Sequence, residues 1–560
     1  MDFTGPETAG EAGANFDVDD CGAVLHWTIM THPRRPLASL LAVCLLSLGA
    51  ITRGQAVPAS AQIAELRAAH AYEAAVREGP PAVRAFLTGF PKGADLHVHL
   101  SGAVYAETFI RDAAEDGICV DPDQLKFAKP PCTGKLVPAK DLSGNISSAN
   151  QVLYDKLIDA FSMRSFVPYA GFSGHDQFFA TFGRFGGLKN HTGEWVDEAA
   201  ARAAAQNQQY LELMETPPFS HAAQIAYAIG WNPELQHADR AAFARFRQEL
   251  LDRGLRDEVA TDREDVRLAE AESRRLEHCG TPQAAPACQV EIRYIYQVLR
   301  GYPPEQVFAQ TLLGFETVEK SIDENDPGFV GINFVMPEDG YISMRDYTLQ
   351  MKMVGYLHSI YPKVHISLHA GELTMGLVPP EGLRFHIRQA VKIAHAERIG
   401  HGVDVMYEDH AEALLREMAE GHVMVEINLS SNEGILGVSG ADHPFPIYRA
   451  AHVPVALSTD DEGVSRIDIT HEYERAALDY HLSYDDLKQL ARTGMEHDFL
   501  PGESLWAEPD AFTVPVAACR NQELGSDNPA AACKEFLGKS EKAAAQWELE
   551  HRFRAFEANF

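Results

Sequence analysis

Residues able to bind a metal or move protons end four strand-like runs of this chain. The four endings are D-L-H-V-H at 95–99, S-L-H-A-G-E at 367–372, R-I-G-H-G at 398–402 and L-S-T-D-D at 457–461. Because alternate residues of a strand face the same side, we expect His97 and His99 to point into one shared space.

The residue types at these endings favour a zinc site. Three imidazoles and one carboxylate form a borderline-soft set of N and O donors that suits Zn²⁺ and leaves one position open for water. Taken singly, an H-x-H in a strand or two adjacent Asp residues are ordinary features of cores and loop caps. Four such endings in one chain instead indicate a single site.

Eight short β-rich runs alternate with helical stretches beyond Pro91. They span 94–99, 209–214, 290–296, 329–335, 364–369, 399–405, 422–428 and 453–458. This alternation predicts an α/β chain folded as a (β/α)8 TIM-type barrel, whose active site lies where the strands end.

The rest of the chain is interpreted as elaboration of that barrel. Residues 62–90 are predicted to form an N-terminal helical segment, because apolar residues recur at helical spacing. The barrel is expected over 91–504, with insertions at about 110–206 and 216–288, after the first two strands. Residues 505–560 are predicted to form a C-terminal helical extension.

Residues 1–61 are interpreted as an upstream extension and a signal peptide. Met30 is followed by an arginine pair, an apolar run over 37–51 and an Ala-Ser-Ala stretch that ends at Ala61. A charged region, a short apolar core and small residues before a cleavage point are typical of secretory leaders. We expect a periplasmic or secreted protein that is free of the membrane after cleavage near Ala61; a buried apolar helix is the alternative.

The cysteines agree with export. Loss of the leader would leave six, which fall in local pairs: Cys119 with Cys132, Cys279 with Cys288 and Cys519 with Cys533. We predict three loop-closing disulfides, with six free thiols as the alternative.

The charge of the chain limits its partners. A formal net charge of −32 repels polyanions, so nucleic acid and anionic membranes are poor candidates. A small neutral molecule would not be repelled, and acidity that serves only solubility is an equally acceptable interpretation.

Taken together, the four motifs resemble those of adenosine deaminases in the amidohydrolase superfamily. D-L-H-V-H-L-x-G, S-L-H-A-G-E, R-I-G-H-G and L-S-T-D-D occur in the family's order, and the resemblance runs from about Lys92 to Pro501. The leader, the helical segment and the long first insertion are most similar to the secreted, growth-factor-related branch, and D-D-E-G-V-S-R at 460–466 to its bacterial members. The H-x-E with P-C-x-x-C arrangement of the other nucleobase deaminases is absent.

The resemblance implies a set of metal ligands and a reaction. His97, His99, His369 and Asp460 would bind one Zn²⁺ per chain. The expected reaction is hydrolytic deamination of adenosine and 2′-deoxyadenosine. The family resemblance also implies that the N-terminal helices could support a homodimer.

The remaining motif residues receive roles in the reaction from the same resemblance. His401 would orient the attacking water and accept its proton. Glu372 would protonate N1 of the purine, which requires a raised pKa. Asp461 would hydrogen-bond N7.

Two positions depart from the family pattern. Ser101 stands where many adenosine deaminases have an Asp that binds the ribose 5′-hydroxyl, and Met336 stands where a Gly is expected whose N–H reaches N3. Both changes concern nucleoside recognition and leave the hydrolytic residues intact.

Other interpretations stay open from the sequence alone. They are a related deaminase of another aminopurine or amine, and an extracellular nucleoside-binding module without catalysis. Of the residues outside the motifs, Ser430-Ser431-Asn432 resembles the family's S-N element and is either support for the site or a plain loop. His365, His395 and His422 are predicted to be core histidines.

Overall fold

The structure is a computed structural model that describes residues 59–144, 147–188, 191–326 and 328–560. The apolar run of the predicted leader, with Cys21 and Cys44, lies outside the described residues. Among the helices that are described, none is long and apolar enough to cross a membrane.

Eight parallel strands form the centre of the molecule, in the order in which they occur along the chain. They are β1 (Gly93–His99), β5 (Gln208–Glu215), β6 (Glu291–Leu299), β7 (Phe329–Val335), β8 (His365–Ala370), β9 (Arg398–His401), β10 (Met424–Ile427) and β11 (Val455–Leu457). The sheet closes between its first and last strands, since the N–H of His99 donates to the carbonyl of Asp460 (3.0 Å) and that of Asp460 to His97 (2.8 Å). The predicted (β/α)8 barrel is therefore confirmed.

The last three strands are shorter than the sequence pattern predicted. β9 ends at His401 because this residue has a φ of +69°, and Asp460 after β11 has a φ of +60°. Residues other than Gly rarely adopt this left-handed backbone conformation, so the backbone is locally strained at both His401 and Asp460.

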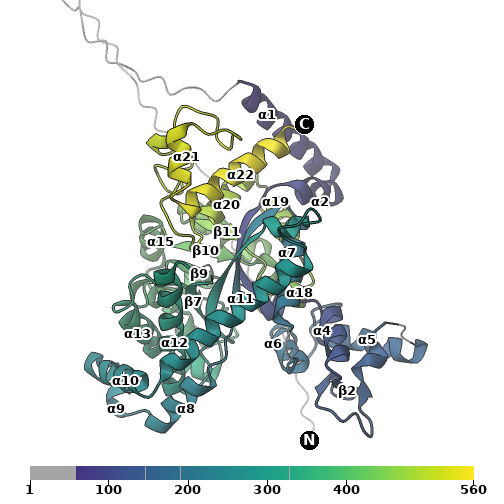
Figure 1. The fold of residues 1–560 in the computed structure, drawn as a ribbon, viewed down its shortest axis with the longest axis vertical. Coiled ribbons are helices and arrows are strands. Elements are labelled where there is room, and N and C mark those ends of the chain that lie inside the picture. The colour runs from purple at the N-terminus through teal and green to yellow at the C-terminus, as the bar shows by residue number, and fades with distance from the viewer. Residues whose placement is uncertain (1–58, 145–146, 189–190, 327) are drawn as a thin grey trace, which may run out of the picture. The chain divides into compact units, whose positions relative to one another are not determined.

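Helices surround the barrel and bury its outer face, as Figure 1 shows. Those between successive strands include α7 (Thr192–Ala205), α8 (Ser220–Ile229), α9 (Pro233–Gln236), α10 (Arg240–Asp252), α11 (Val259–Leu276), α12 (Pro304–Glu324), α13 (Tyr341–His358), α14 (His386–Lys392), α15 (Ala411–Glu420), α16 (Leu429–Leu436) and α17 (Phe445–Ala450). After β11 come α18 (Glu462–Ser465), α19 (Ile469–Asp479) and α20 (Tyr484–Glu496). The packing is tight: a Cβ added to Gly314 of α12 would lie 2.9 Å from the ring of Tyr296 on β6.

The connection from β1 to β5 contains a subdomain with its own apolar core (Figure 1, blue). It comprises α3 (Leu100–Ala103), α4 (Ala106–Glu115), β2 (Cys119–Asp121), β3 (Lys126–Ala128), β4 (Val137–Pro138), α5 (Ser148–Ala160) and α6 (Gly174–Phe185). β2, β3 and β4 form a small antiparallel sheet. Helix α6 returns to the barrel, where a Cβ on Gly174 would lie 2.0 Å from the carbonyl of Gly434 in α16.

The two ends of the described chain pack against α20. They consist of α1 (Ala59–Glu78) and α2 (Pro80–Gly89) at one end, and α21 (Ala531–Leu537) and α22 (Glu541–Glu557) at the other. The ammonium of Lys488 in α20 lies 2.6 Å from a carboxylate oxygen of Glu65 in α1 and 2.7 Å from one of Glu557 in α22. One buried cation thus ties the N-terminal helix, the barrel and the C-terminal extension together.

The three predicted disulfides are present. Cys119–Cys132 closes a loop of the subdomain, Cys279–Cys288 a loop before β6, and Cys519–Cys533 a loop of the C-terminal extension. Each ring is short, so each bond stabilises a local loop and does not connect distant parts of the fold.

Candidate active site

The four predicted metal ligands meet at the C-terminal ends of three strands. His97 and His99 lie at the end of β1, His369 lies in β8, and Asp460 lies three residues after the end of β11. His97, His369 and Asp460 are almost fully buried, and the side chain of His99 is 13% exposed. We call these four residues the metal centre.

The donor atoms of the metal centre are spaced as ligands of one ion. Nε2 of His369 lies 3.2 Å from Nε2 of His97 and 3.2 Å from Nε2 of His99. Oδ1 of Asp460 lies 3.4 Å and 3.2 Å from the same two nitrogens. With zinc–nitrogen distances of about 2.0–2.1 Å, a tetrahedron has edges of about 3.3 Å. The residues present therefore fit a zinc ion.

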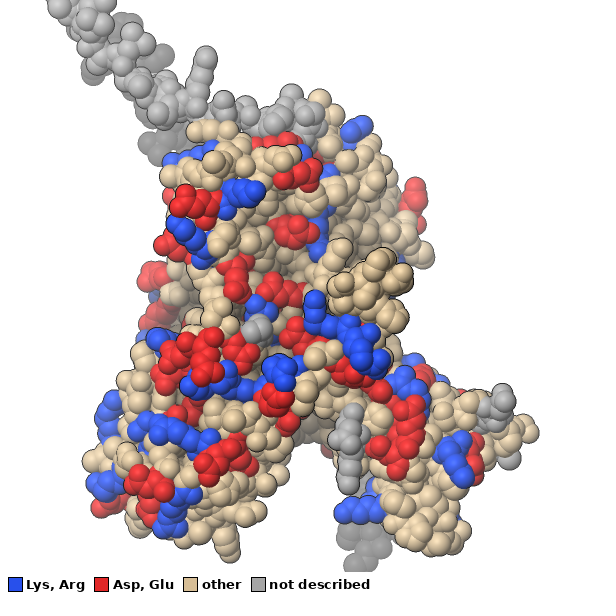
Figure 2. All heavy atoms as spheres, in the orientation of Figure 1, with Lys and Arg blue, Asp and Glu red and all other residues tan. Residues whose placement is uncertain are grey.

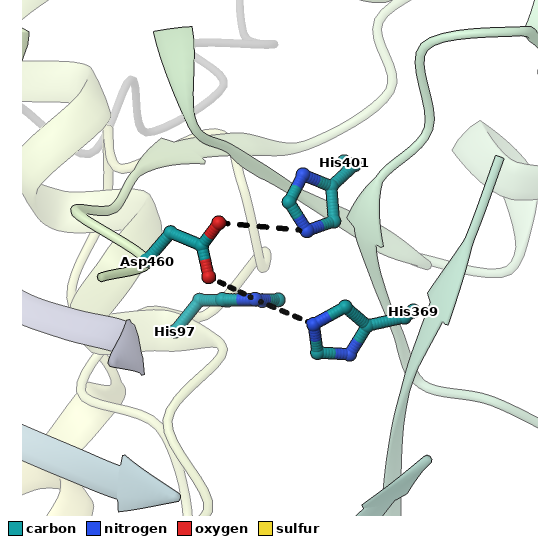
Figure 3. Close-up of side chains that lie close together, drawn as sticks. All are labelled: His97, His369, His401 and Asp460. Carbon is teal, nitrogen blue, oxygen red and sulfur yellow. Dashed lines mark hydrogen bonds and ion pairs between the residues drawn. The ribbon is translucent and has the colours of Figure 1, made fainter. Parts of the chain in front are cut away.

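His401 is the fourth histidine at this site and lies beside Asp460 of the metal centre (Figure 3). Its Nε2 is 3.9 Å from Oδ2 of Asp460 and 3.8 Å from Oε1 of Glu372, although its ring joins His97, His369 and Asp460 in one cluster of converging donors. Nε2 of His401 and Oδ1 of Asp460 are buried without a hydrogen bond to the described residues. Unpaired buried polar atoms are costly, so they indicate that a ligand or water belongs between these groups.

Each histidine of the metal centre is held through its other ring nitrogen. Nδ1 of His97 lies 2.5 Å from Oε2 of Glu426, and Nδ1 of His369 lies 2.8 Å from Oδ1 of Asn333. The side-chain amide of Gln297 contacts Nδ1 of His99. Such partners fix the ring orientation and leave Nε2 free for a metal.

A buried cation supports the Glu426 carboxylate from below. The guanidinium of Arg398 on β9 is 1% exposed, lies 2.8 Å from Oε1 of Glu426 and 2.6 Å from Oε2 of Glu212, and covers the ring of Phe499. Sequence reasoning missed Glu426, Asn333 and Gln297 in these roles. The signal available was a polar residue inside an otherwise apolar strand, which does not show what the side chain meets.

Glu372 and Asp461 are the acidic groups beside the metal centre. Both are buried, and burial together with the charge of Asp460 raises the pKa of each well above the usual value of a carboxyl group. Asp461 Oδ1 has no hydrogen-bond partner among the described residues. A Cβ on Gly102 would lie 1.4 Å from this oxygen, which explains why the first motif needs Gly at that position.

A chain of hydrogen bonds reaches His401 from behind. The N–H of Phe445 donates to Nδ1 of His443 (3.1 Å), whose Nε2 lies 2.9 Å from Oδ1 of Asn432. The amide nitrogen of Asn432 lies 2.9 Å from Nδ1 of His401. Followed from its backbone donor, the chain makes Nδ1 of His401 an acceptor and places the ring hydrogen on Nε2.

Ser431 and Asn432 thus support the site and are more than a plain loop. The hydroxyl of Ser431 donates to Oδ2 of Asp460 (2.6 Å), while Asn432 contacts His401. Both come from α16, the helix against which the subdomain packs.

A cavity of about 360 Å³ opens over the metal centre. Phe178, Phe179 and Phe182 of α6 line one side, and Ser101 and Met336, the two residues expected at the nucleoside, also line it. No Lys or Arg is among its lining residues in the described part of the chain.

Met336 shows why a Gly was expected at its position. Its φ is +87°, a region that glycine enters freely and other residues enter at a cost, and its side chain is 40% exposed at the cavity. The sequence therefore places a bulky residue in a backbone conformation that favours glycine.

Taken alone, the fold and the donor set define a (β/α)8 barrel with a buried group of His and Asp donors, which fits one metal ion, at the C-terminal ends of its strands. Comparison with known proteins extends this description. Residues 261–506 match the family model of adenosine deaminase, a range that includes His369, Glu372, His401 and both Asp residues but not β1. This part of the chain is therefore similar to the adenosine deaminase family.

Known relatives match the chain only in part. The adenosine deaminase of Escherichia coli strain SMS-3-5 is 38% identical over 155 residues, which are 28% of this chain and 42% of the relative. Adenosine deaminases of the strains SE11 and IAI39 match to the same extent. The chain thus spans well under two thirds of the length of these relatives.

Solved structures with a similar arrangement share little sequence. An adenine deaminase from Arthrobacter aurescens is 17% identical with a TM-score of 0.46, covering 73% of this chain and 94% of that one. A zinc-bound amidohydrolase from Burkholderia ambifaria is 18% identical with a TM-score of 0.47, covering 75% and 88%.

Proposed function

We propose that the protein is an exported, zinc-dependent adenosine deaminase that converts adenosine and 2′-deoxyadenosine into inosine and 2′-deoxyinosine with release of ammonia. The observation that carries this proposal is the convergence of four donor atoms at the base of a cavity that Glu372 and Asp461 also line, with Nε2 of His97 and His99 each 3.2–3.4 Å from a donor atom of His369 and of Asp460. An N/O ligand set, an acid and a further hydrogen-bonding carboxyl in one enclosed space are what hydrolysis of an aminopurine requires.

The metal centre would hold the zinc ion. When bound, zinc acts as a Lewis acid that brings the pKa of a water molecule close to neutrality. Glu426, Asn333 and Gln297 keep the three imidazoles oriented for this task.

Glu372 would move the proton that starts the reaction. Because burial raises its pKa, Glu372 carries a proton that it passes to N1 of the purine, and the carboxylate that results takes a proton from the attacking water. Protonation of N1 breaks the conjugation of the ring and makes C6 open to attack. The C6–O bond then forms, the C6–N bond breaks, and the second hydrogen of the water leaves with the amino group as ammonia.

His401 would orient the water. Burial lowers its pKa to about 4, so the ring is neutral at physiological pH. With Nδ1 accepting from Asn432, the remaining ring hydrogen sits on Nε2, which faces Glu372 and Asp460. This arrangement suits a donor, so we assign acceptance of the water's proton to Glu372 and not, as the family resemblance implied, to His401.

Asp461 would fix the purine ring through N7. N7 is an acceptor, so its partner must donate a hydrogen. The raised pKa of Asp461 keeps that carboxyl protonated and able to donate.

The lining of the cavity favours a neutral nucleoside. A phosphate would need a cation, and the described residues that line the cavity include no Lys or Arg, whereas three Phe side chains offer apolar surface for a purine or ribose face. On the face drawn in Figure 2, the described acidic and basic side chains are interspersed and form no broad basic area. Ser101 and Met336 would adjust the ribose and N3 contacts.

Export and membership of the secreted, growth-factor-related branch are part of the same proposal. Three disulfides support an oxidising compartment, and the subdomain after β1 supports the branch. The domain division at about 62, 91 and 505, and a homodimer formed through the N-terminal helices, are proposed with it. N-terminal sequencing of the protein recovered from periplasm and medium, with its mass in solution, tests these points.

The decisive experiment measures deamination directly. The zinc-loaded protein is offered adenosine, 2′-deoxyadenosine, AMP, adenine and N6-methyladenosine, and ultraviolet absorbance and ammonia are followed with and without chelator. We expect chelator-sensitive conversion of the two nucleosides and poor conversion of AMP. No turnover of any purine by the folded, zinc-loaded protein would contradict the proposal and favour another amine substrate or a binding role.

A further inference from the structure

A buried carboxylate that no motif contains lies directly behind Glu372. Glu338 follows β7 and is 1% exposed, although a carboxylate is one of the side chains least often buried. It faces the loop after β8, which carries Glu372 into the cavity.

Glu338 receives the backbone of that loop. Its Oε1 accepts from the N–H of Gly371 (3.1 Å) and its Oε2 from the N–H of Glu372 (2.8 Å). Two consecutive amides thus point at one carboxylate, and the second belongs to the residue proposed to move the proton.

The opposite side of the same loop is held by the residues that directly follow β9. The N–H of Gly402 donates to the carbonyl of Ala370 (3.1 Å), and the N–H of Val403 to the carbonyl of Gly371 (2.8 Å). Gly371 has a φ of +78°, and a Cβ there would lie 2.5 Å from Oδ1 of Asp404. The peptide before Glu372 is therefore fixed on both sides, with Glu338 as the side-chain part of the clamp.

Glu338 is in turn held by two cationic or hydrogen-bonding groups. Nδ1 of His386 lies 2.5 Å from Oε1, and the ring of His386 stacks on that of Tyr347 at 3.7 Å. Arg300 lies 3.9 Å from the same oxygen and donates to the carbonyl of His369 (2.8 Å). Burial opposes the charge of Glu338, but His386 and Arg300 keep the pKa of this carboxyl below its usual value.

We infer that Glu338 is a positioning residue for the proposed deamination: it holds Glu372 at the distance from the purine at which its proton reaches N1. This inference rests on the proposed function. Glu338 lines no part of the cavity, so it acts on the reaction only through Glu372.

The chemistry of the site explains why an amide cannot replace this carboxylate. Three N–H groups, from Gly371, Glu372 and His386, converge on the two oxygens of Glu338. Glutamine would place an NH₂ group against at least one of them, so donor would face donor. The loop would shift, and a displacement of about 1 Å in a reacting group is enough for a loss on the order of 10²-fold.

The test compares Glu338→Gln with Glu338→Asp and with Asp262→Asn. Asp262 is a fully buried acid of α11 that lies away from the cavity and provides a matched acid-to-amide control. For Glu338→Gln we expect kcat for adenosine to fall on the order of 10²-fold, with KM and zinc affinity within about threefold of wild type. Glu338→Asp, which keeps the charge and both acceptors, should recover part of the loss, and Asp262→Asn should keep wild-type kcat.

Hydrogen exchange supplies a second readout that needs no turnover. In Glu338→Gln, the amides of Gly371 and Glu372 should exchange faster while the rest of β8 stays protected. Unchanged exchange, or a kcat within threefold of wild type, overturns the inference, as does a loss that appears equally in zinc affinity. Faster exchange in a protein whose wild type deaminates no purine would leave the positioning role intact and remove the proposed function.

Discussion

The two ends of the barrel carry the same kinds of residue with different results. At the C-terminal ends of the strands, His97, His99 and His369 turn their Nε2 atoms to one point. At the N-terminal ends, His365 and His422 pair one by one with surface carboxylates, Glu397 at 2.9 Å and Asp510 at 2.6 Å, and no three donors there converge among the described residues. What distinguishes a site is convergence and burial, not the presence of histidine and acid.

The lower face also corrects an expectation from the sequence. His365, His395 and His422 are not core histidines: His395 is exposed, and the side chains of His365 and His422 are 39% and 52% exposed. They lie at or just before the beginning of strands, where the chain enters the barrel from solvent. The lower cavity, of about 670 Å³, is larger than the one over the metal centre, so size alone does not mark the site either.

The largest expected effect on activity distinguishes a histidine whose nitrogen faces several other donors from a histidine that pairs with one carboxylate. His369→Ala removes a nitrogen that faces two other donors, whereas His497→Ala removes one that contacts only Asp510 at 2.7 Å. We expect the first variant to lose at least about 10³-fold in kcat/KM for adenosine, since a zinc ligand supports several kcal/mol of transition-state stabilisation. The second should stay within about twofold. Steady-state kinetics with zinc content measured on both proteins checks the pair, and similar losses in both would remove the distinction between the two faces.

A second comparison sets two acids against each other. Glu372→Gln keeps the size of the side chain but removes the group that moves the proton, and a loss on the order of 10²–10⁴-fold in kcat is expected. Glu397→Gln, beside His365 on the lower face, should leave kcat unchanged. Absorbance assays at saturating adenosine decide this, and near-full turnover by Glu372→Gln would show that the proton takes another route.

The candidate metal ligands could be predicted from the sequence, but the residues that hold them in place could not. H-x-H in β1 and the Asp pair after β11 could be predicted because a strand's alternation and its end define where such side chains point. Glu426 supports His97 only because closure of the barrel brings β10 and β1 to either side of β11, which no local pattern encodes. The early end of β9 depends on the positive φ angle at His401, which the residue type itself does not reveal.

A third comparison tests that supporting role. Glu426 holds His97, and Asp510 holds His422 and His497 in a similar way. Glu426→Gln should weaken zinc binding by about 10–100-fold, because the partner of a ligating imidazole tunes its affinity. Asp510→Asn should leave zinc binding unchanged. Competition with a chromophoric chelator measures both, and equal affinities would mean that Glu426 serves the fold alone.

Backbone strain gives a smaller contrast. Met336 at the cavity and His422 on the lower face both have positive φ, +87° and +53°. Glycine at either position should relieve about 1 kcal/mol of strain. Only Met336→Gly should also change the ratio of kcat/KM between adenosine and 2′-deoxyadenosine or N6-methyladenosine, by a few-fold, because only its side chain lines the cavity. Substrate ratios that stay constant in both variants would show that Met336 does not take part in selection.

The smallest effect concerns stability without catalysis. Asp498 lines the lower cavity, and burial, opposed by Lys542 and aided by Glu212, raises its pKa to about 7. A carboxyl whose pKa is higher in the folded than in the unfolded state contributes stability that is complete below about pH 4 and is lost as the pH rises through about 7. Asp498→Asn cannot ionise, so its Tm should match that of wild type near pH 4, if it folds equally well, and exceed it increasingly up to pH 8. The gain in Tm should be on the order of 2 °C for each kcal/mol of added stability, with kcat unchanged.

Melting curves between pH 4 and pH 8, with adenosine turnover at pH 7, test this prediction. A constant Tm difference at all pH values would mean that packing and not the buried charge separates the two proteins, and a change in kcat would mean that the lower face is coupled to the site after all, through Glu212 and Arg398.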